Sequence, residues 1–389
     1  MKCQAAILRG VGNDWEVCEI DLDEPRHGEV LVRMVTAGIC RTDDHFATGD
    51  AVPSTELVEM MRAAGMATPD WFPLIGGHEG AGIVEEVGPG VSGLQPGDHV
   101  GMSFIPACGK CRWCVSGQSY ICDVGANLFA KEMITDGTVR RHLGEQGLMA
   151  TTQLGTFSEY VVTSEDSLIK IDESIPFHAA SLVSCGVTTG WGSATVSAGT
   201  QPGDTVIVIG IGGVGMNALQ GARAAGAKYV IGVDPVEFKR DSAPQFGATH
   251  TIAWAHEAVE LVRELTAGVM ADRVVLTAGV VHADLIPVAM MLTRKGGTCV
   301  LTGMTPLTEM SVPLILVDMA NSCKQLKGTL YGGMNPRASM PMLLSMYQAG
   351  ALKLDELVTR RYRLDQINEA IDDMREGRNI RGLIEFPRS

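Results

Sequence analysis

A predicted strand that runs directly into a glycine-rich turn and then a helix constrains the fold of this chain more than any other feature. The apolar segment 204–209 leads into Gly210-Ile-Gly-Gly-Val-Gly215, and a helix-forming segment follows at 216–225. From residue 202 to about 330, apolar strand candidates alternate with helix-length segments; the strands are expected near 205–209, 229–233, 250–252, 272–276, 297–303 and 325–331. This alternation predicts an α/β fold with a doubly wound parallel sheet.

The G-x-G-x-x-G pattern in the turn is typical of dinucleotide binding. Gly210 allows a tight turn, Gly212 lets the backbone approach a pyrophosphate, and Gly215 lets the helix pack closely on the strand. The cofactor-binding residues predicted in this turn are Gly210, Gly212, Gly213, Val214 and Gly215. The alternative is a glycine-rich turn in an α/β core that binds no nucleotide.

An acidic residue at the end of the second predicted strand indicates which dinucleotide is bound. Asp234 follows the strand 229–233 and lies about 20 residues beyond the glycine turn. A carboxylate there accepts hydrogen bonds from the ribose hydroxyls and repels a 2′-phosphate. The sequence therefore predicts NAD as the cofactor in preference to NADP.

Four closely spaced cysteines predict a structural zinc site. Cys108, Cys111, Cys114 and Cys122 have the spacing C-x2-C-x2-C-x7-C, which lets one loop place four thiolates around one tetrahedral ion. A closed set of four thiolates suits structural zinc, because no coordination position is open to substrate. An iron–sulfur cluster is the competing interpretation, but its last cysteine is normally followed by Pro, and Asp123 is found here. Unmetallated thiols or disulfides are the remaining alternative.

Composition and charge narrow the classes of function. In 389 residues, 46% are hydrophobic and 20% charged, which is ordinary for a two-domain soluble enzyme. A formal net charge of -14 argues against nucleic acid and anionic membranes as partners. Apolar runs are interrupted too early for a signal peptide or a membrane helix. Cysteines with metal-like spacing indicate a reducing compartment, so a cytoplasmic location is expected.

Three short segments in the β-rich part of the chain, residues 1 to about 185, carry further metal-binding side chains. They are 38–45, 76–82 and 183–190, and they contain Cys40, His78 and Cys185. Taken singly, these residues are more often core residues than ligands. Together with the four-cysteine loop and the dinucleotide pattern, in this order along nearly the whole chain, they make the sequence similar to the zinc-containing medium-chain alcohol dehydrogenases.

The resemblance implies a domain division. A β-rich, GroES-like catalytic domain would comprise 1–186 and 331–389, and a Rossmann dinucleotide-binding domain would comprise 187–330. It also implies two zinc ions per subunit. The second is a catalytic zinc held by Cys40, His78 and Cys185, with a fourth position left for water or an alcohol.

The resemblance assigns a proton path and the residues around the catalytic zinc. Thr42 would take the alcohol proton, and His45 would pass it to solvent, a role suited to a group that titrates near neutrality. The alternative for His45 is a solvated surface histidine. Asp43 would orient His78, and Glu79 would be the acid beside the zinc. Asp44 has no implied role and is expected to be a solvated charge.

Further cofactor contacts are implied outside the glycine turn. Arg41 and Arg381 match the residues that grip the pyrophosphate, where a guanidinium can bind two oxygens at once. Lys239 resembles the lysine beside the adenosine ribose, with an exposed helix charge as its alternative. Thr189 fits the position that touches the nicotinamide.

Two features depart from the common family pattern. An insert at about 51–70 separates Cys40 from His78, and its apolar spacing predicts a short amphipathic helix starting near Thr55, close to the active-site mouth; a surface decoration is the alternative. Ala126 stands where glutathione-dependent formaldehyde dehydrogenases would have Arg. This difference weakens a formaldehyde–glutathione activity.

We therefore expect a cytoplasmic, homo-oligomeric zinc alcohol dehydrogenase that oxidises a primary or secondary alcohol to an aldehyde or ketone by hydride transfer to NAD. The insert resembles that of the actinobacterial nitrosoaniline-dependent alcohol dehydrogenases, nicotinoproteins associated with mycofactocin. This implies a non-exchanging NAD that is reoxidised by an external, mycofactocin-like electron acceptor. The alternatives are a formaldehyde or polyol dehydrogenase with exchangeable NAD and, from another class, a non-catalytic, zinc-stabilised NAD-binding redox sensor.

Overall fold

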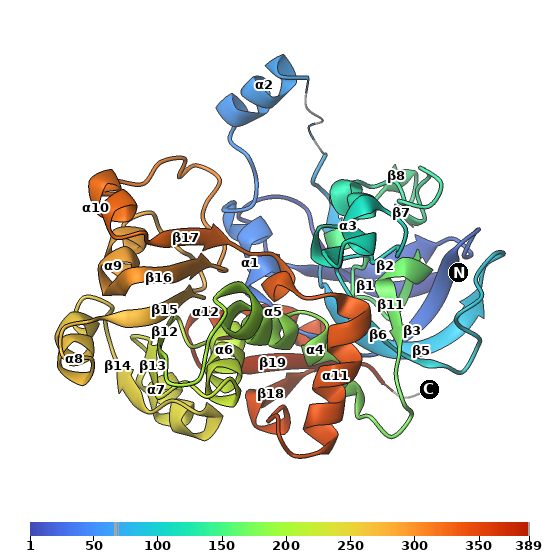
Figure 1. The fold of residues 1–389 in the computed structure, drawn as a ribbon. Coiled ribbons are helices and arrows are strands. Elements are labelled where there is room, and N and C mark those ends of the chain that lie inside the picture. The colour runs from blue at the N-terminus through green and yellow to red at the C-terminus, as the bar shows by residue number, and fades with distance from the viewer. Residues whose placement is uncertain (66–67, 69, 388–389) are drawn as a thin grey trace. The chain divides into compact units, whose positions relative to one another are not determined.

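The computed structural model describes residues 1–65, 68 and 70–387, which fall into two compact units. Unit 1 contains Met1–Cys185 and Asn335–Ser389, and unit 2 contains Gly186–Met334 (Figure 1). Residues 66, 67 and 69 of the predicted insert lie outside the described residues, as does the side chain at Ala126. No helix in the described part of the chain is long and apolar enough to cross a membrane.

Unit 2 is built on a parallel sheet, as the alternation of strands and helices predicts. Its strand order is β14-β13-β12-β15-β16-β17, and every neighbouring pair is parallel. The strands are β12 (Thr205–Ile209), β13 (Tyr229–Val233), β14 (His250–Ile252), β15 (Ala271–Leu276), β16 (Thr293–Leu301) and β17 (Gln325–Gly328). The order reverses beside β12, so ligand-binding loops are expected at the carboxyl ends of β12 and β15.

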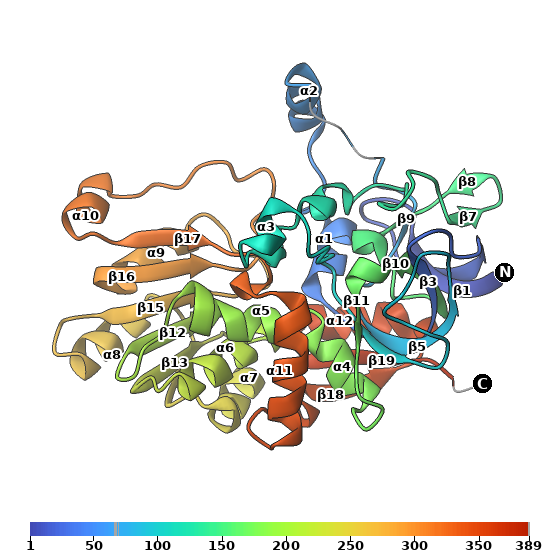
Figure 2. The same cartoon turned by 45° about the vertical axis from the view of Figure 1, so that its right-hand side comes forward.

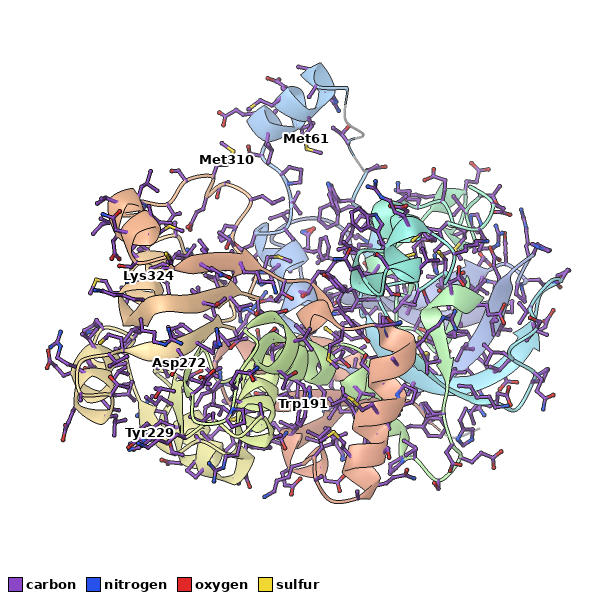
Figure 3. The ribbon with its side chains drawn as sticks, in the orientation of Figure 1. Met61, Trp191, Tyr229, Asp272, Met310 and Lys324 are labelled. Carbon is purple, nitrogen blue, oxygen red and sulfur yellow. The ribbon has the colours of Figure 1, made fainter. Side chains whose placement is uncertain are left out.

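Helices and a partly buried acid, Asp272, hold this sheet together. The helices are α5 (Gly186–Gly192), α6 (Gly213–Ala224), α7 (Glu237–Ser242), α8 (Ala258–Leu265), α9 (Leu285–Leu292) and α10 (Leu316–Asn321). Asp272, labelled in Figure 3, accepts from the Thr205 backbone N–H at 2.7 Å and from Arg294 Nε at 2.5 Å. One carboxylate therefore ties β15 to both neighbouring strands, β12 and β16. Apolar side chains of the strands and of α8 and α9 pack together as a hydrophobic core of this unit.

Unit 1 is β-rich and takes in the C-terminal segment. Among its described residues, one sheet has the order β11-β6-β5-β3-β19-β18 with β10 also on β3, and a second sheet has the order β8-β7-β2-β1-β4-β9. The strands are β1 (Lys2–Leu8), β2 (Glu16–Leu22), β3 (Glu29–Gly38), β4 (Leu74–Ile75), β5 (Glu79–Val87), β6 (His99–Met102), β7 (Arg141–Leu143), β8 (Gln146–Gly147), β9 (Met149–Ala150), β10 (Tyr160–Ser164), β11 (Leu168–Lys170), β18 (Val358–Tyr362) and β19 (Arg381–Glu385). β19 pairs with β3, which carries the chain end back into this unit.

The helices of unit 1 lie around these sheets. They are α1 (Arg41–Thr48), α2 (Thr55–Ala63), α3 (Arg112–Val115), α4 (Phe177–Val183), α11 (Pro336–Gln348) and α12 (Ile367–Arg375). α2 confirms the helix predicted in the insert, but Ser54 is its N-cap, because the Ser54 hydroxyl accepts from the Leu57 N–H at 3.2 Å. None of the α2 residues is buried, and the helix stands clear of the strands of its own unit in Figures 1 and 2.

A buried ion pair anchors the start of β3. Glu29 and Arg140 are both fully buried, and Arg140 Nε and Nη2 each donate to the Glu29 carboxylate at 2.8 Å. Arg140 Nη2 also donates to Asp136 at 2.6 Å. A bidentate pair of this kind satisfies both desolvated charges at once.

Replacing Arg140 by Met should therefore lower the free energy of unfolding by about 3 kcal/mol, because it leaves the Glu29 charge buried without its partner. Arg33→Met is the matched control, since it removes only the exposed pair with Glu85 and should cost no more than about 1 kcal/mol. Chemical unfolding of the three proteins measures both values. Equal losses in the two variants would contradict the role given to Arg140.

Candidate functional site

The first candidate metal site is the four-cysteine loop. The sulfur atoms of Cys108, Cys111, Cys114 and Cys122 all lie within 4.8 Å of one another. Cys108 and Cys114 sulfurs are 3.9 Å apart, and those of Cys111 and Cys122 are 3.8 Å apart. Four thiolates at about 2.3 Å from one tetrahedral zinc would be about 3.8 Å from each other. The cysteines that the structure describes are all free thiols, so this loop is not a disulfide knot.

Local structure favours the anionic form of one sulfur in this loop, that of Cys111. Cys111 is the N-cap of α3, and its backbone N–H donates to Cys108 Sγ at 3.4 Å. Backbone N–H groups of Asp123 and Cys114 lower the pKa of Cys111 to about 6, whereas burial raises the pKa of Cys122 to about 12. A divalent cation bound here would displace the protons of these thiols.

The second candidate metal site is fully buried and contains Cys40, His78, Glu79 and Cys185. One ligand atom from each lies within 4.8 Å of the others. Cys40 follows β3, and His78 comes directly before β5. Because β3 and β5 are antiparallel with Gly38 opposite Glu79, both residues reach the same end of the sheet. Cys185 joins them after α4, where Ser184 Oγ accepts from the Gly80 N–H at 3.2 Å.

The groups around this cluster prepare it for a cation. Asp43 is fully buried, accepts from the Gly77 N–H at 2.8 Å and lies 3.2 Å from His78 Nδ1. This leaves Nε2 of His78 as the free ring nitrogen for a metal. Hydrogen bonding to Cys185 and the nearby His78 ring hold the pKa of Cys40 well below its usual value despite its burial. Two thiols and an imidazole in this arrangement are a donor set that zinc prefers.

Glu79 and Arg381 lie beside the same cluster. Burial raises the pKa of Glu79 to about 7, although Arg381 Nη2 donates to its Oε1 at 2.7 Å. The other carboxylate oxygen, Oε2, is buried without a hydrogen-bond partner among the described residues. Arg381 Nη1 donates to the Ile39 carbonyl at 2.7 Å. Both of these Arg381 hydrogen bonds lie next to the candidate metal site, and its predicted pyrophosphate contact stays a prediction.

Helix α1 carries the predicted proton path. Thr42 Oγ1 lies 3.8 Å from Cys40 Sγ, so its hydroxyl borders the metal cluster. The His45 side chain is 2% exposed, which contradicts the alternative of a solvated surface histidine. Its Nδ1 lies 3.0 Å from Asp50 Oδ2. Sequence reasoning missed Asp50, although a carboxylate just after the Gly49 helix end was a usable signal.

The expectation that Asp44 is a solvated charge was wrong. Asp44 is fully buried, lies 2.6 Å from Arg375 Nη2 of α12 and 3.3 Å from Arg41 Nε. Arg375 comes from the far end of the chain, so no local pattern could have found this pair. Arg41 is therefore partly engaged by Asp44 while its side chain stays one-third exposed, and its predicted pyrophosphate contact is a proposal.

In unit 2, the glycine turn has the shape of a phosphate cradle. Gly210 has φ +89°, and a Cβ at Gly210 or Gly215 would collide with neighbouring backbone. A Cβ at Gly212 would meet nothing within 4 Å, so open space borders the backbone there. Gly212 is also the N-cap of α6, and Gly213 and Val214 begin that helix. An open backbone surface at a helix N-terminus suits a pyrophosphate.

The end of β13 carries the residues that are predicted to bind the ribose. Asp234 is buried; its carboxylate accepts from the Ile211 N–H at 3.1 Å and the Val236 N–H at 3.0 Å. Lys239 Nζ lies 3.8 Å from Asp234 Oδ2, and its side chain is 16% exposed, so it is no freely solvated helix charge. Thr189 on α5 has a buried hydroxyl with no hydrogen-bond partner among the described residues. Such a hydroxyl is available to a ligand.

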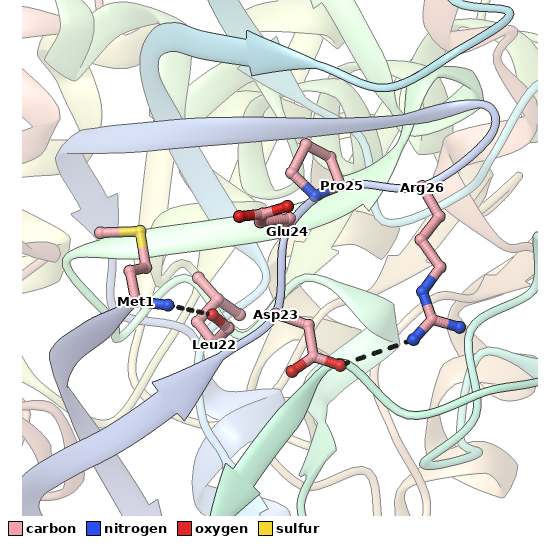
Figure 4. A pocket seen from close by; sticks show the side chains of 6 residues that line it. All are labelled: Met1, Leu22, Asp23, Glu24, Pro25 and Arg26. Atoms are coloured by element: carbon pink, nitrogen blue, oxygen red, sulfur yellow. Dashed lines mark hydrogen bonds and ion pairs between the residues drawn. The ribbon is translucent and has the colours of Figure 1, made fainter.

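A pocket at the N-terminal edge of unit 1 does not compete with these sites. It has a volume of about 520 Å³ and is lined by Met1 and residues 22–26 (Figure 4). The Met1 ammonium already donates to the Leu22 carbonyl at 2.7 Å, and Asp23 pairs with Arg26 at 3.8 Å. The charged groups of Met1, Asp23 and Arg26 are therefore paired within the chain, and the pocket contains no predicted site residue.

Comparisons with known proteins place the chain in a family. Residues 26–173 match the family described as alcohol dehydrogenase GroES-like domain, and residues 213–349 match the family described as zinc-binding dehydrogenase. The chain is 47% identical over 386 residues to alcohol dehydrogenase B of Mycobacterium tuberculosis and covers 99% of each chain. It is 47% identical over 384 residues to the NDMA-dependent alcohol dehydrogenase of Amycolatopsis methanolica, again covering 99% of each chain.

A solved structure shares the same architecture. Benzyl alcohol dehydrogenase from Acinetobacter calcoaceticus is similar with a TM-score of 0.87 and 27% identity over 100% of both chains. The resemblance inferred from the motifs is therefore confirmed, and so is the fold class of a GroES-like part with a parallel dinucleotide-binding sheet.

The two metal clusters share no residue, so each can be emptied separately. Cys185→Ala should remove one of two zinc ions and most activity while thermal stability stays close to that of the parent protein. Cys111→Ser should remove the other zinc and lower the melting temperature, because structural zinc contributes on the order of 10 kcal/mol to folding in small zinc modules. Elemental analysis and thermal unfolding measure both.

Cys3→Ala is the control, since Cys3 is a buried thiol that belongs to neither cluster. It should retain both ions. A single zinc in the active parent protein, or loss of activity in Cys111→Ser without loss of thermal stability, would contradict the division into two sites.

Proposed function

This chain belongs to the zinc-containing alcohol dehydrogenases, and we propose that Cys40, His78 and Cys185 are the ligands of its catalytic zinc. As a member of that family it is an oxidoreductase that converts an alcohol to the aldehyde or ketone and uses zinc and NAD(P). The observation that carries the assignment is the buried cluster with ligand atoms within 4.8 Å, in which Asp43 occupies the Nδ1 side of His78. The four-cysteine loop is proposed as the second, structural zinc site.

Residues around the cluster are proposed to remove the proton of the alcohol hydroxyl in two steps. Zinc in such a site supplies Lewis-acid polarisation of the alcohol oxygen. Thr42, 3.8 Å from Cys40 Sγ, is proposed to accept the hydroxyl proton, and His45 is proposed to deliver it to solvent. Glu79 lies beside the proposed ligands; its Oε2 has no hydrogen-bond partner among the described residues, and Arg381 balances its charge. A bound nicotinamide would accept the hydride from the alcohol carbon, so the oxidation would remove one proton and one hydride.

The dinucleotide is proposed to be NAD, held by unit 2. The turn at 210–215 would take the pyrophosphate, with Arg41 and Arg381 as further cations, and Thr189 would contact the nicotinamide. Asp234 would accept from the ribose hydroxyls with Lys239 beside it. The buried carboxylate of Asp234 supports this choice, because a 2′-phosphate would place two more negative charges against it.

We further propose that NAD stays bound through the catalytic cycle and is reoxidised in place by an external acceptor. Support comes from the 47% identity to an enzyme described as NDMA-dependent. The insert adds a second argument, because α2 buries none of its residues and keeps Leu57, Val58 and Met61 partly exposed for contact with a bound group. The acceptor in the cell would be a mycofactocin-like carrier.

The assembly and location are also proposals. Large apolar side chains at Met310, Ile315, Leu316 and Val317 are between 64% and 73% exposed, which favours a homo-oligomer. None of the ten cysteines, all of which are described, forms a disulfide, and this suits the proposed reducing, cytoplasmic environment. The catalytic domain is proposed as 1–186 with 331–389, and the dinucleotide-binding domain as 187–330.

The cofactor preference can be tested at Asp234. Asp234→Ala should raise the affinity for NADP relative to NAD, because it removes the repelling charge and frees Lys239 to contact a 2′-phosphate. Glu237→Gln is the control, since Glu237 is an exposed acid three residues further along. Binding titrations of apoprotein measure the ratio. Equal affinity of the parent protein for both dinucleotides would show that Asp234 does not read the ribose.

Retention of NAD can be tested on the purified protein. We expect denaturation to release close to one nicotinamide nucleotide per subunit. Alcohol oxidation should be slow with free NAD alone, because a cofactor with a small dissociation rate exchanges slowly with free NAD. It should be fast with a nitrosoaniline dye, which reoxidises the bound NADH in place. Near-empty protein that turns over rapidly with added NAD would contradict the proposal while leaving the zinc assignment intact.

A further inference from the structure

The turn that ends α1 brings a carboxylate back over the helix. Gly49 is the C-cap with φ +89°, and its N–H donates to the His45 carbonyl at 3.1 Å. The Ala51 N–H donates to the same carbonyl at 3.0 Å. Because both bonds close on His45, the intervening Asp50 is held beside the ring of that histidine.

Two contacts of the same carboxylate oxygen, Oδ2, hold Asp50 beside the His45 ring. Its Oδ2 accepts from the Thr48 hydroxyl at 2.7 Å and lies 3.0 Å from His45 Nδ1. Partial burial opposes ionisation of Asp50, but the Thr48 hydroxyl, the His45 ring and the Arg41 charge together lower its pKa. A carboxylate only accepts hydrogen bonds, so it requires a proton on Nδ1 of its partner.

We propose that Asp50 is a positioning residue for proton removal: it holds the His45 imidazole through Nδ1 so that Nε2 is the nitrogen that receives the proton. The negative charge of Asp50 also stabilises the imidazolium that forms. A neutral ring without this partner could place its proton on either nitrogen, and only one tautomer has Nε2 free. The inference rests on the proposed role of His45 in the proton path.

The charged groups around the pair are consistent with this role. Asp50 approaches from the turn, and Arg41 of the same helix acts on the Asp50 carboxylate. Asp44, the neighbour of His45, is neutralised by Arg375 of α12 and by Arg41. Among the described residues, Asp50 is therefore the carboxylate that contacts the ring.

The test compares Asp50→Ala and Asp50→Asn in the zinc-loaded enzyme with its bound cofactor. The rate of NADH formation in a single turnover is measured from pH 5.5 to 9. Asp50→Ala should slow it at least about tenfold at pH 7 and leave the KM for alcohol unchanged, since a group that acts on proton transfer contributes through the rate. Asp50→Asn should lose less, because its amide oxygen still accepts from Nδ1.

The pH profile separates this role from a structural one. Both variants should reach half of their maximal rate at a lower pH than the parent, because removing a negative charge favours the uncharged ring. Asp355→Asn is the matched control: it breaks a carboxylate–histidine contact of 2.6 Å with His178 elsewhere in unit 1 and should leave the profile unchanged. An unaltered rate and profile in folded Asp50→Ala would overturn the inference.

His45→Gln distinguishes failure of the premise from failure of the inference. If His45→Gln retains the parental rate, the proposed proton path is wrong; if it slows turnover while Asp50→Ala does not, only the role of Asp50 is wrong. Nitrogen-15 NMR of labelled parent protein, assigned with His45→Gln, gives a reading that needs no Asp50 variant. Neutral His45 protonated on Nδ1 supports the inference, and protonation on Nε2 overturns it.

Discussion

The antiparallel pairing of β3 with β5 is the constraint on which the rest of the catalytic unit depends. Its register sets Gly38 opposite Glu79, so the residues just outside the pair, Cys40 and His78, meet at one end of the sheet. Gly38 is required there, because a Cβ would collide with the Glu79 carboxylate. β19 lies on the other side of β3, and its first residue, Arg381, meets the same carboxylate. One strand register thus brings the proposed zinc ligands Cys40 and His78 close to the acid Glu79. The same register places Glu79 beside the positive charge of Arg381.

The buried carboxylates at this end of the sheet are each paired with another titratable or charged group. Three fully buried acids surround or adjoin the ligands, and each has a cationic or titratable partner: Asp43 with His78, Glu79 with Arg381, and Asp44 with Arg375. Unpaired carboxylates at this depth would be costly. With each carboxylate paired, the proposed zinc and its thiolate ligands would add little uncompensated charge at this end of the sheet.

Local patterns in the sequence reveal only those features that are local in the chain. The parallel sheet of unit 2 followed from strand–helix alternation, and the observed bounds of β12 and β13 match the expected segments. The four-cysteine loop was visible because its ligands lie within 15 consecutive residues. Asp44 was misjudged because its partner, Arg375, lies 331 residues away. Whether a charged side chain is buried depends on contacts with residues that are distant in the sequence. The periodicity of apolar residues along the chain does not reveal such contacts.

Helix α1 shows how one short segment can serve several partners. Successive residues of a helix point about 100° apart, so neighbouring side chains face different surroundings. Asp43 faces His78, Asp44 faces Arg375, and His45 faces Asp50. Thr42 and His45 are three residues apart and so share a face of the helix, as the proposed proton path requires. A shift of one residue in this helix would separate every pair at once, which is why the turn at Gly49 and the end of β3 must hold it at both ends.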